Sequence, residues 1–295
     1  MNDSDWLSDV FENNRTRLRA IAYNMLGSLS QADDAVQQSW IRLSRAGTSE
    51  VENLPAWLTT IVVRVCLNLL RSHRARREEP MGFHVPDPVV SPADQRSPED
   101  EAILADSVGL ALQVVLETLT PAERLAFVLH DMFDLPFDEI APMLGRTAAT
   151  TRQLASRARR RVREADVQAP ETDVARQRKV VDAFFQAAHM GDLEALVAVL
   201  DPDVLLRTDG GTALPEASVV IRGAKEVAGR TLGIAQASAP KMPVLVNGAA
   251  GVVVLLDRRP VAVIGFTVSD GKIVQINSIA DPERIERLDL GFLDR

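Results

Sequence analysis

The sequence predicts a multidomain protein in which two all-α domains, the second with a helix-turn-helix, precede an α+β domain. Apolar residues recur at helical spacing through most of residues 1–77 and 99–167, which predicts the two helical domains. Between them, residues 78–98 contain five prolines and little periodicity, so we expect a linker there. After a second break, residues 174–295 begin with two helices and continue in runs rich in β-branched residues. This order predicts a curved antiparallel sheet with helices packed on one face.

The bulk composition is that of an ordinary globular protein. The 295 residues are 46% hydrophobic and 25% charged, and their number suggests two or three compact domains. The polar, acidic N-terminus does not resemble a secretory signal, and no apolar run approaches the roughly 18 residues that cross a bilayer. Cys66 is the single cysteine, so an internal disulfide is excluded and a buried thiol is expected. We therefore expect a cytoplasmic protein with no membrane partner.

The distribution of charge points to nucleic acid although the net charge of −8 does not. Five arginines and no carboxylate lie between Arg64 and Arg77. Seven arginines, again without a carboxylate, lie between Arg146 and Arg163. Because local basic stripes rather than net charge mark a DNA-binding surface, both stretches are candidates for DNA contact.

Three helices are expected in the first domain. Gly27 is a suitable end for the first helix, and Ser30–Asp33 resembles a capping box that opens the second. The third helix is expected from about Pro55 to Arg71. On a helical wheel its polar stripe lies opposite an apolar stripe made by Leu58, Ile61, Val62, Val65 and Leu69. The polar stripe consists of Trp57, Thr60, Arg64, Asn68 and Arg71.

A helix-turn-helix is expected in the second domain, after a capping box at Thr120–Glu123. Phe137–Leu144 would form its first helix, Gly145 its turn, and Thr147 the cap of the arginine-rich second helix. The wheel of the second helix separates a packing face, with Leu154, Ala155, Ala158 and Val162, from an exposed polar face. That polar face carries Arg152, Ser156, Arg159 and Arg163, with Arg160 beside them. Guanidinium groups suit guanine edges and phosphates, although a solvated amphipathic helix would show the same pattern.

Several motifs of the helical part resemble those of extracytoplasmic-function RNA polymerase sigma factors. The matching segments of sigma domain 4 are Leu119–Phe133, Phe137–Ala141 and Arg152–Arg159, and those of domain 2 are Ala20–Gly27, Ala32–Gln37 and Ala56–Ile61. The resemblance implies a protein that binds core RNA polymerase and directs recognition and opening of promoter DNA. A helix-turn-helix regulator fused to a SnoaL-like enzyme domain is the alternative, but it would not need a polymerase-docking domain 2.

The resemblance also implies roles for individual residues. Polymerase binding falls on Asp33, Asp34, Val36 and Gln37. Contact with the minus-ten element falls on Trp57, Thr60, Arg64, Asn68 and Arg71, although Trp57 could equally be a core residue. Contact with the minus-thirty-five element falls on Thr151, Arg152, Ser156, Arg159, Arg160 and Arg163.

The third domain resembles the cone-shaped SnoaL-like fold that one subgroup of these sigma factors carries. Asp209-Gly210-Gly211 matches part of an Asp-Gly-Gly-Gly-Lys signature, and Asp281-Pro282 begins a loose match to Asn-Pro-Asp-Lys-Leu. Val85–Pro88 similarly approaches a Leu-Pro-Glu-Pro motif, while Thr212 and Ala213 depart from the first signature. The resemblance implies that this domain regulates the sigma factor within the same chain, with these two signatures as its contact points.

Catalysis by the third domain is the competing hypothesis. Relatives of the fold include enzymes with a pocket carboxylate or a His–Asp pair, and the candidates here are His189, Asp203, Asp209 and Asp257. No spaced His/Asp/Tyr pattern accompanies them, and turn formation before two glycines accounts for Asp209. We expect no catalytic residue, no metal and no cofactor. A small-molecule ligand in the cone stays open, and a monomer is expected for the free protein.

Overall fold

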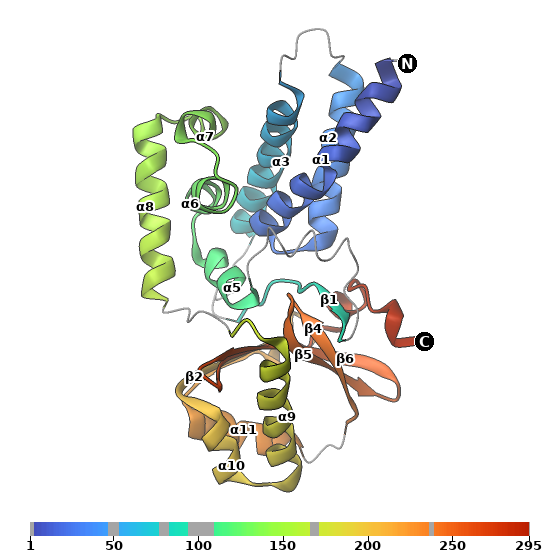
Figure 1. The fold of residues 1–295 in the computed structure, drawn as a ribbon, viewed down its shortest axis with the longest axis vertical. Coiled ribbons are helices and arrows are strands. Elements are labelled where there is room, and N and C mark those ends of the chain that lie inside the picture. Colours follow the sequence, from blue (N-terminus) through green and yellow to red (C-terminus); the bar gives the residue numbers. More distant parts are fainter. Residues whose placement is uncertain are drawn as a thin grey trace. The chain divides into compact units, whose positions relative to one another are not determined.

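The computed structural model describes residues 3–46, 53–76, 83–93, 109–165, 171–235 and 239–294. The chain divides into two compact units, each described here by itself (Figure 1). Unit 1 contains Met1–Glu79, Pro98–Val108 and Val115–Asp166, and unit 2 contains Pro80–Ser97, Gly109–Val114 and Val167–Arg295. The helix expected from near residue 98 falls partly outside the described residues; within them Gly109 is not helical, and α5 extends over Leu110–Thr118.

Unit 1 begins with three mutually packed helices, α1 (Asp3–Leu26), α2 (Leu29–Ala46) and α3 (Leu54–Arg76). Gly27 ends α1 as predicted, with a φ of +70° that glycine adopts without strain. The start of α2 differs from the prediction. The amide of Ala32 already donates to the carbonyl of Ser28, so the helix begins before Ser30 and that residue is not its cap.

The helix-turn-helix of unit 1 is confirmed. After α6 (Pro121–Phe127) and a short π-helix, η1 (Val128–Met132), α7 (Phe137–Leu144) leads to α8 (Ala148–Glu164). Gly145 has the left-handed conformation, with φ +64°, and the Thr147 side chain caps α8 by accepting from the Thr150 amide. Thr120 and Glu123 form the predicted capping box at α6.

A buried arginine joins the two helical parts of unit 1. The side chain of Arg124, in α6, is 2% exposed. Its Nε donates to the carbonyl of Asn24 in α1 at 2.9 Å, and its Nη1 lies 2.7 Å from Glu117 Oε1. Because a buried guanidinium requires such partners, this arrangement fixes α6 against the end of α1.

The third helix is long and apolar enough to be compared with a membrane-spanning helix. By length and composition alone, Leu54–Ser72 of α3 could cross a membrane, although it contains Arg64 and Arg71. Half of this stretch is buried inside the protein. A mostly apolar, half-buried helix of this kind is typical of the core of a globular helical domain.

Unit 2 is built on one seven-stranded sheet in the order β1-β4-β5-β6-β7-β2-β3. All neighbours are antiparallel except β2 and β7, which are parallel. The strands are β1 (Val90–Pro92), β2 (Leu200–Asp209), β3 (Val219–Arg222), β4 (Lys241–Val246), β5 (Ala249–Leu256), β6 (Arg259–Ser269) and β7 (Lys272–Ile279). Asp270 and Gly271, both with positive φ, make the predicted hairpin between β6 and β7.

Helices cover the sheet around two apolar cores. One core joins the sheet to α9 (Val174–Met190), α10 (Leu193–Val199) and α11 (Ala224–Ala235). The sequence predicted α9 and α10 but not α11. The other core gathers Val85, Leu110 and Ile285 against β4, β5, β6 and β7. The remaining short elements are η2 (Pro215–Ala217), α12 (Pro282–Ile285) and η3 (Gly291–Asp294).

The segment predicted to be a linker contributes to this sheet, which corrects the prediction for its described part. β1 pairs with β4 at the sheet edge, where Val90 lies opposite Val246. The Val89 amide donates to Asn247 Oδ1 at 2.9 Å, and Val85 is fully buried. Prolines disfavour the interior of a helix but are tolerated in an edge strand, so a proline-rich sequence did not distinguish a linker from this edge.

Candidate functional sites

The minus-ten candidates lie on the outer face of α3, as the helical wheel predicted. Arg64, Asn68 and Arg71 are exposed, while Trp57 and Thr60 are half-buried. The opposite stripe is packed, with Leu58, Ile61, Val62 and Val65 buried. The intermediate burial of Trp57 fits both alternatives considered for it, a base contact and a core residue.

The polar face of α8 is also confirmed, with one correction. Arg152, Ser156, Arg160 and Arg163 are exposed, while Ala155 and Ala158 are buried as predicted. Thr151 is fully buried instead, and its hydroxyl donates to the Thr147 carbonyl at 3.0 Å. Its side chain therefore offers no surface to DNA. On the helical wheel Thr151 lies next to the packed stripe. Whether its side chain is buried therefore depends on how the neighbouring helices pack against α8.

Two arginines of α8 pair with carboxylates that are distant in the sequence. Arg159 Nε lies 2.5 Å from Asp131 Oδ1, and Arg161 Nη1 lies 3.0 Å from Glu123 Oε2. The Arg152 guanidinium lies over the Phe137 ring, 5.3 Å from its centroid. Stacking holds Arg152 in place and leaves its donors available.

Glu123 stays charged in this environment. Burial favours its neutral form, but hydrogen bonds from Thr120 and the charge of Arg161 outweigh burial and lower the pKa of Glu123. Arg161 thereby forms an ion pair within unit 1, whereas the exposed Arg152 and Arg163 form none with the described residues.

Three of the four polymerase candidates line a groove between α1 and α2, and the fourth, Asp34, is exposed and does not line it. The groove has a volume of about 450 Å³, and Asp33, Val36, Gln37 and Trp40 form its α2 side. Asp33 Oδ1 and Oδ2 accept from Arg19 at 2.6 and 3.0 Å, while Val36 is 4% exposed. Neither Asp33 nor Asp34 lies in the first turn of α2, so the helix macrodipole does not account for them.

The two regulatory signatures converge around the segment that was expected to be a linker. Asp209 Oδ2 accepts from the Val85 amide at 2.9 Å and from Arg284 Nη1 at 2.6 Å, and lies 3.1 Å from His84 Nδ1. Arg284 Nε also donates to Asp87 Oδ1 at 2.7 Å, and its Nη2 donates to the Val85 carbonyl. We call His84, Val85, Asp87, Asp209 and Arg284 the Asp209 cluster. It lies wholly within unit 2.

The remaining signature residues support this cluster. A Cβ on Gly211, whose φ is +60°, would lie 1.7 Å from Asp281 Oδ2, so glycine permits the close approach of the two loops. Asp281 is the N-cap of α12, because its Oδ1 accepts from the amides of Glu283 and Arg284. This cap fixes the backbone of Arg284 beside the cluster. Gly210 has no room for a side chain either, because a Cβ there would lie 2.0 Å from the Leu214 carbonyl oxygen. Pro282 is exposed and is the first residue of α12.

Sequence reasoning had singled out neither His84 nor Arg284. Both fall in or beside the motif remnants, and Arg284 occupies the position of the lysine in the terminal signature. The basic residue at the lysine position of the terminal motif was the available signal. Only the fold shows that the residues meet.

The charge on Asp209 is strongly favoured. Burial would raise its pKa, but hydrogen bonds from His84 and the Val85 amide, together with the Arg284 charge, hold the pKa of Asp209 well below its usual value. Cys66 shows the opposite behaviour, because burial raises the pKa of its thiol to about 12. Cys66 is thus the inert buried thiol that the sequence predicted.

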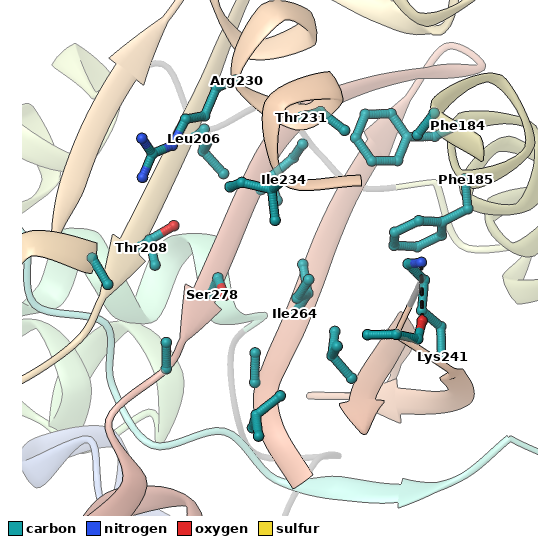
Figure 2. A pocket seen from close by; sticks show the side chains of 18 of the residues that line it. Phe184, Phe185, Leu206, Thr208, Arg230, Thr231, Ile234, Lys241, Ile264 and Ser278 are labelled. Atoms are coloured by element: carbon teal, nitrogen blue, oxygen red, sulfur yellow. Dashed lines mark hydrogen bonds between the residues drawn. The ribbon is translucent and has the colours of Figure 1, made fainter. Parts of the chain in front are cut away.

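None of the four catalytic candidates lines the cavity of the C-terminal domain. This cavity has a volume of about 410 Å³, and its described lining includes no acidic residue and no histidine (Figure 2). His189, Asp203 and Asp257 are exposed, while Asp209 belongs to the Asp209 cluster. The described lining therefore offers neither a carboxylate nor a histidine as a general base.

Comparison with known proteins identifies the class first. Residues 10–76 match Sigma-70 region 2, and residues 109–162 match Sigma-70 region 4. The helices α1 to α3 and the helix-turn-helix thus define a sigma factor, a protein that binds the RNA polymerase core and promoter DNA.

Relatives along the whole chain place it within that class. The chain is 36% identical over 294 residues to a probable ECF RNA polymerase sigma factor, SigI, of Mycobacterium tuberculosis, covering 98% of both chains. It is 36% identical over 286 residues to SigJ of the same species, covering 93% of this chain and 91% of SigJ. The crystal structure of SigJ matches with a TM-score of 0.75 and 34% identity, covering 96% of this chain and 99% of that one. The protein belongs to the ECF RNA polymerase sigma factors, with a C-terminal SnoaL-like domain. Sigma factors are not enzymes, and the alternative of an enzyme fusion is not favoured.

Proposed function

We propose that the C-terminal domain controls promoter-directed transcription within the same chain by binding the segment between regions 2 and 4. The Asp209 cluster is the observation that carries this proposal, because it joins both signatures to residues 84–87. A control of this kind replaces a separate inhibitory protein. The domain is connected to α8 by a short stretch, which keeps it at high local concentration.

Chain lengths explain how such binding acts on transcription. Region 2 ends at residue 76 and region 4 begins at residue 109, so residues 77–108 connect them. An extended residue spans at most about 3.3–3.6 Å, so a free connector of this length reaches roughly 100 Å. With residues 83–93 held on the sheet, six residues, 77–82, separate region 2 from the held segment, and fifteen, 94–108, separate it from region 4; chains of these lengths reach at most roughly 20 and 50 Å. Binding and release of residues 83–93 therefore change how far regions 2 and 4 can separate.

The finer contacts of the sigma regions are part of the proposal. On α3, Arg64, Asn68 and Arg71 contact the minus-ten element, and Trp57 and Thr60 extend the same stripe. On α8, Arg152 and Arg163 are the main contacts with the minus-thirty-five element. Asp34 and Gln37 on α2 contact the polymerase. Their exposure on single helix faces supports these assignments. We propose further that the free protein is a cytoplasmic monomer without a membrane partner, which sedimentation and cell fractionation test.

A single substitution tests the regulatory role in the full chain. Arg284→Gln removes the charge that joins Asp87 to Asp209, and Arg287→Gln removes a neighbouring exposed arginine as its control. With core polymerase and the cognate promoter, we expect Arg284→Gln to transcribe more than wild type and Arg287→Gln to match wild type. Loss of residues 281–295 is expected to increase activity as well, and a 1–167 protein is expected to differ from the full chain in either direction.

Two arrangements of the chain are required for this control, one restrained and one free. If Arg284→Gln, the 1–280 protein and the 1–167 protein all fold and transcribe at the full-length rate, the regulatory role is wrong. The SnoaL-like domain would then have an independent function.

A further inference from the structure

The SnoaL-like domain has an open apolar cavity between its sheet and the helices α9 and α11. Its volume of about 410 Å³ falls within the range of small-molecule sites in proteins. Phe184 and Phe185 of α9 and Phe266 of β6 form an aromatic wall, with ring centroids 5.3–5.8 Å apart. Figure 2 shows Phe184 and Phe185 on one side of the cavity, beside Ile264.

Polar groups occupy the other side. Thr208 of β2 and Ser278 of β7 are paired neighbours in the parallel part of the sheet, and both line the cavity. Among the residues that the structure describes, neither hydroxyl has a hydrogen-bond partner. Thr231 also lines the cavity, but its hydroxyl donates to the Val227 carbonyl at 2.8 Å. Thr208 and Ser278 are thus available to a ligand.

Two cations and no described acid line the cavity. Lys241 Nζ donates to the Ala239 carbonyl at 3.3 Å and lies 5.4 Å from the Phe185 ring centroid. Arg230 is exposed and forms no ion pair within the described part of the chain. In Figure 2 its guanidinium lies on the side where Thr208 lies, away from Phe185 and Lys241. Arg230 is therefore the cation that has no other role.

We propose that this cavity binds a monocarboxylate with an apolar body, in the class of a medium-chain fatty acid. Arg230 holds the carboxylate, the hydroxyls of Thr208 and Ser278 donate to it, and the apolar body lies against the phenylalanine wall. A guanidinium suits a carboxylate because two parallel N–H groups match its two oxygens. The uncompensated positive charge at a mainly apolar cavity favours an anion over a neutral or cationic molecule.

This inference rests on the proposed regulatory function, for which a monocarboxylate would be the ligand that signals the change. A ligand shifts the chain between its two arrangements only by the difference in its affinity for them. β4 lines the cavity through Lys241 and also pairs with β1, so one strand joins the ligand site to the held segment. Occupation of the cavity can thereby change how tightly residues 83–93 are held.

Binding to the full-length protein tests the proposal directly. Decanoate, decanol and decyltrimethylammonium have the same chain length but differ in the charge of the head group, and calorimetric titration measures each. The variants are Arg230→Gln, Lys225→Gln as an exposed control on the same helix, and Ala262→Phe, which fills the cavity. We expect wild type to bind one decanoate per chain, about tenfold more tightly than decanol, a difference that one charged hydrogen bond supplies.

The variants distinguish this site from general adsorption. Arg230→Gln should weaken decanoate binding about tenfold and leave decanol binding unchanged. The two ligands should then bind this variant with about equal affinity. Lys225→Gln should bind like wild type, and Ala262→Phe should lose both ligands. If Ala262→Phe does not fold, the comparison of Arg230→Gln with Lys225→Gln decides alone.

Three results would overturn the proposal: no decanoate binding at millimolar concentration, equal decanoate affinity of Arg230→Gln and wild type, or tighter binding of the ammonium. None of these results would contradict the regulatory role, because the transcription assay of Arg284→Gln tests that role without a ligand. Conversely, normal decanoate binding together with unchanged transcription of Arg284→Gln and both truncations would overturn the regulatory role alone.

Discussion

Arg284 Nη1 lies 2.6 Å from Asp209 Oδ2, although 75 positions separate the two residues in the chain. The same guanidinium reaches Asp87, which lies 197 positions before it. One arginine of the C-terminal segment thereby connects the end of β2 to the segment between the two sigma regions. The position of residues 83–93 depends on this connection as well as on strand pairing.

Asp209→Asn should loosen residues 84–87 without unfolding the domain. The amide oxygen of asparagine can still accept from Val85, but the charge that attracts Arg284 is lost. Amide hydrogen exchange at Val85 should therefore become faster. Val89, whose amide donates to Asn247, should stay protected in the same protein. Asp203→Asn, at an exposed position, is the control and should leave both amides unchanged. Unchanged protection at Val85 in Asp209→Asn would contradict the role assigned to the carboxylate.

The contribution of Asp209 to stability should depend on pH in a defined direction. Its pKa is lowered in the folded protein, so the folded state binds a proton less readily than the unfolded chain. The stabilisation is then complete above the unfolded aspartate pKa of about 3.9 and is lost as the pH falls below it. The difference in Tm between wild type and Asp209→Asn should be constant near pH 5 and shrink toward pH 2.5. A difference that grows on acidification would show the opposite sign.

Arg152→Ala should weaken promoter binding through region 4. The Arg152 guanidinium is held on the Phe137 ring with its donors exposed, so its loss should cost about 1–3 kcal/mol if it contacts a base. Such a contact also predicts relaxed preference at one position of the minus-thirty-five element, whereas a phosphate contact weakens all sequences alike. Holoenzyme binding to a set of promoter variants measures both effects. Arg161→Ala, whose partner is Glu123, should bind DNA like wild type. If Arg152→Ala and Arg163→Ala both bind like wild type, α8 does not read the promoter.

Asp34→Ala should lower the affinity for core polymerase and leave folding nearly unchanged. Asp34 is exposed beyond the first turn of α2, so its loss should change the free energy of unfolding by no more than about 0.5 kcal/mol. Asp33→Ala is a poorer test, because it also leaves Arg19 without its partner. Asp9→Ala, an exposed acid of α1 outside the groove, is the control. Gradient sedimentation with core enzyme decides, and full holoenzyme formation by Asp34→Ala would exclude this contact.

Local features were predictable from the sequence because their causes lie within a few residues. The exposed stripe of α3 and the packed face of α8 follow from helical periodicity, which the buried Val65 and Ala158 confirm. Gly145, Thr147 and the Thr120 box act on neighbouring backbone groups, and each has its predicted conformation. The start of α2 was misplaced because Ser28 and Ser30 are both suitable caps, and side-chain type alone does not choose between them.

Contacts between distant parts of the chain were not predictable in this way. Asp131 neutralises Arg159 and Glu123 neutralises Arg161, although each acid is far from α8 in the sequence. The buried Thr151 and the edge strand β1 likewise depend on which element packs beside them.

The sequence by itself determined the order of the domains, the helix-turn-helix and the family, because periodicity, caps and turns are short-range and the motifs keep their spacing. The tertiary structure alone decided that residues 84–87 belong to the C-terminal domain, that Arg284 binds Asp209, and that an apolar cavity opens beside Arg230. These features arise where side chains from separate strands and helices converge. Their energies come from burial and charge pairing, which exist only once the chain has folded.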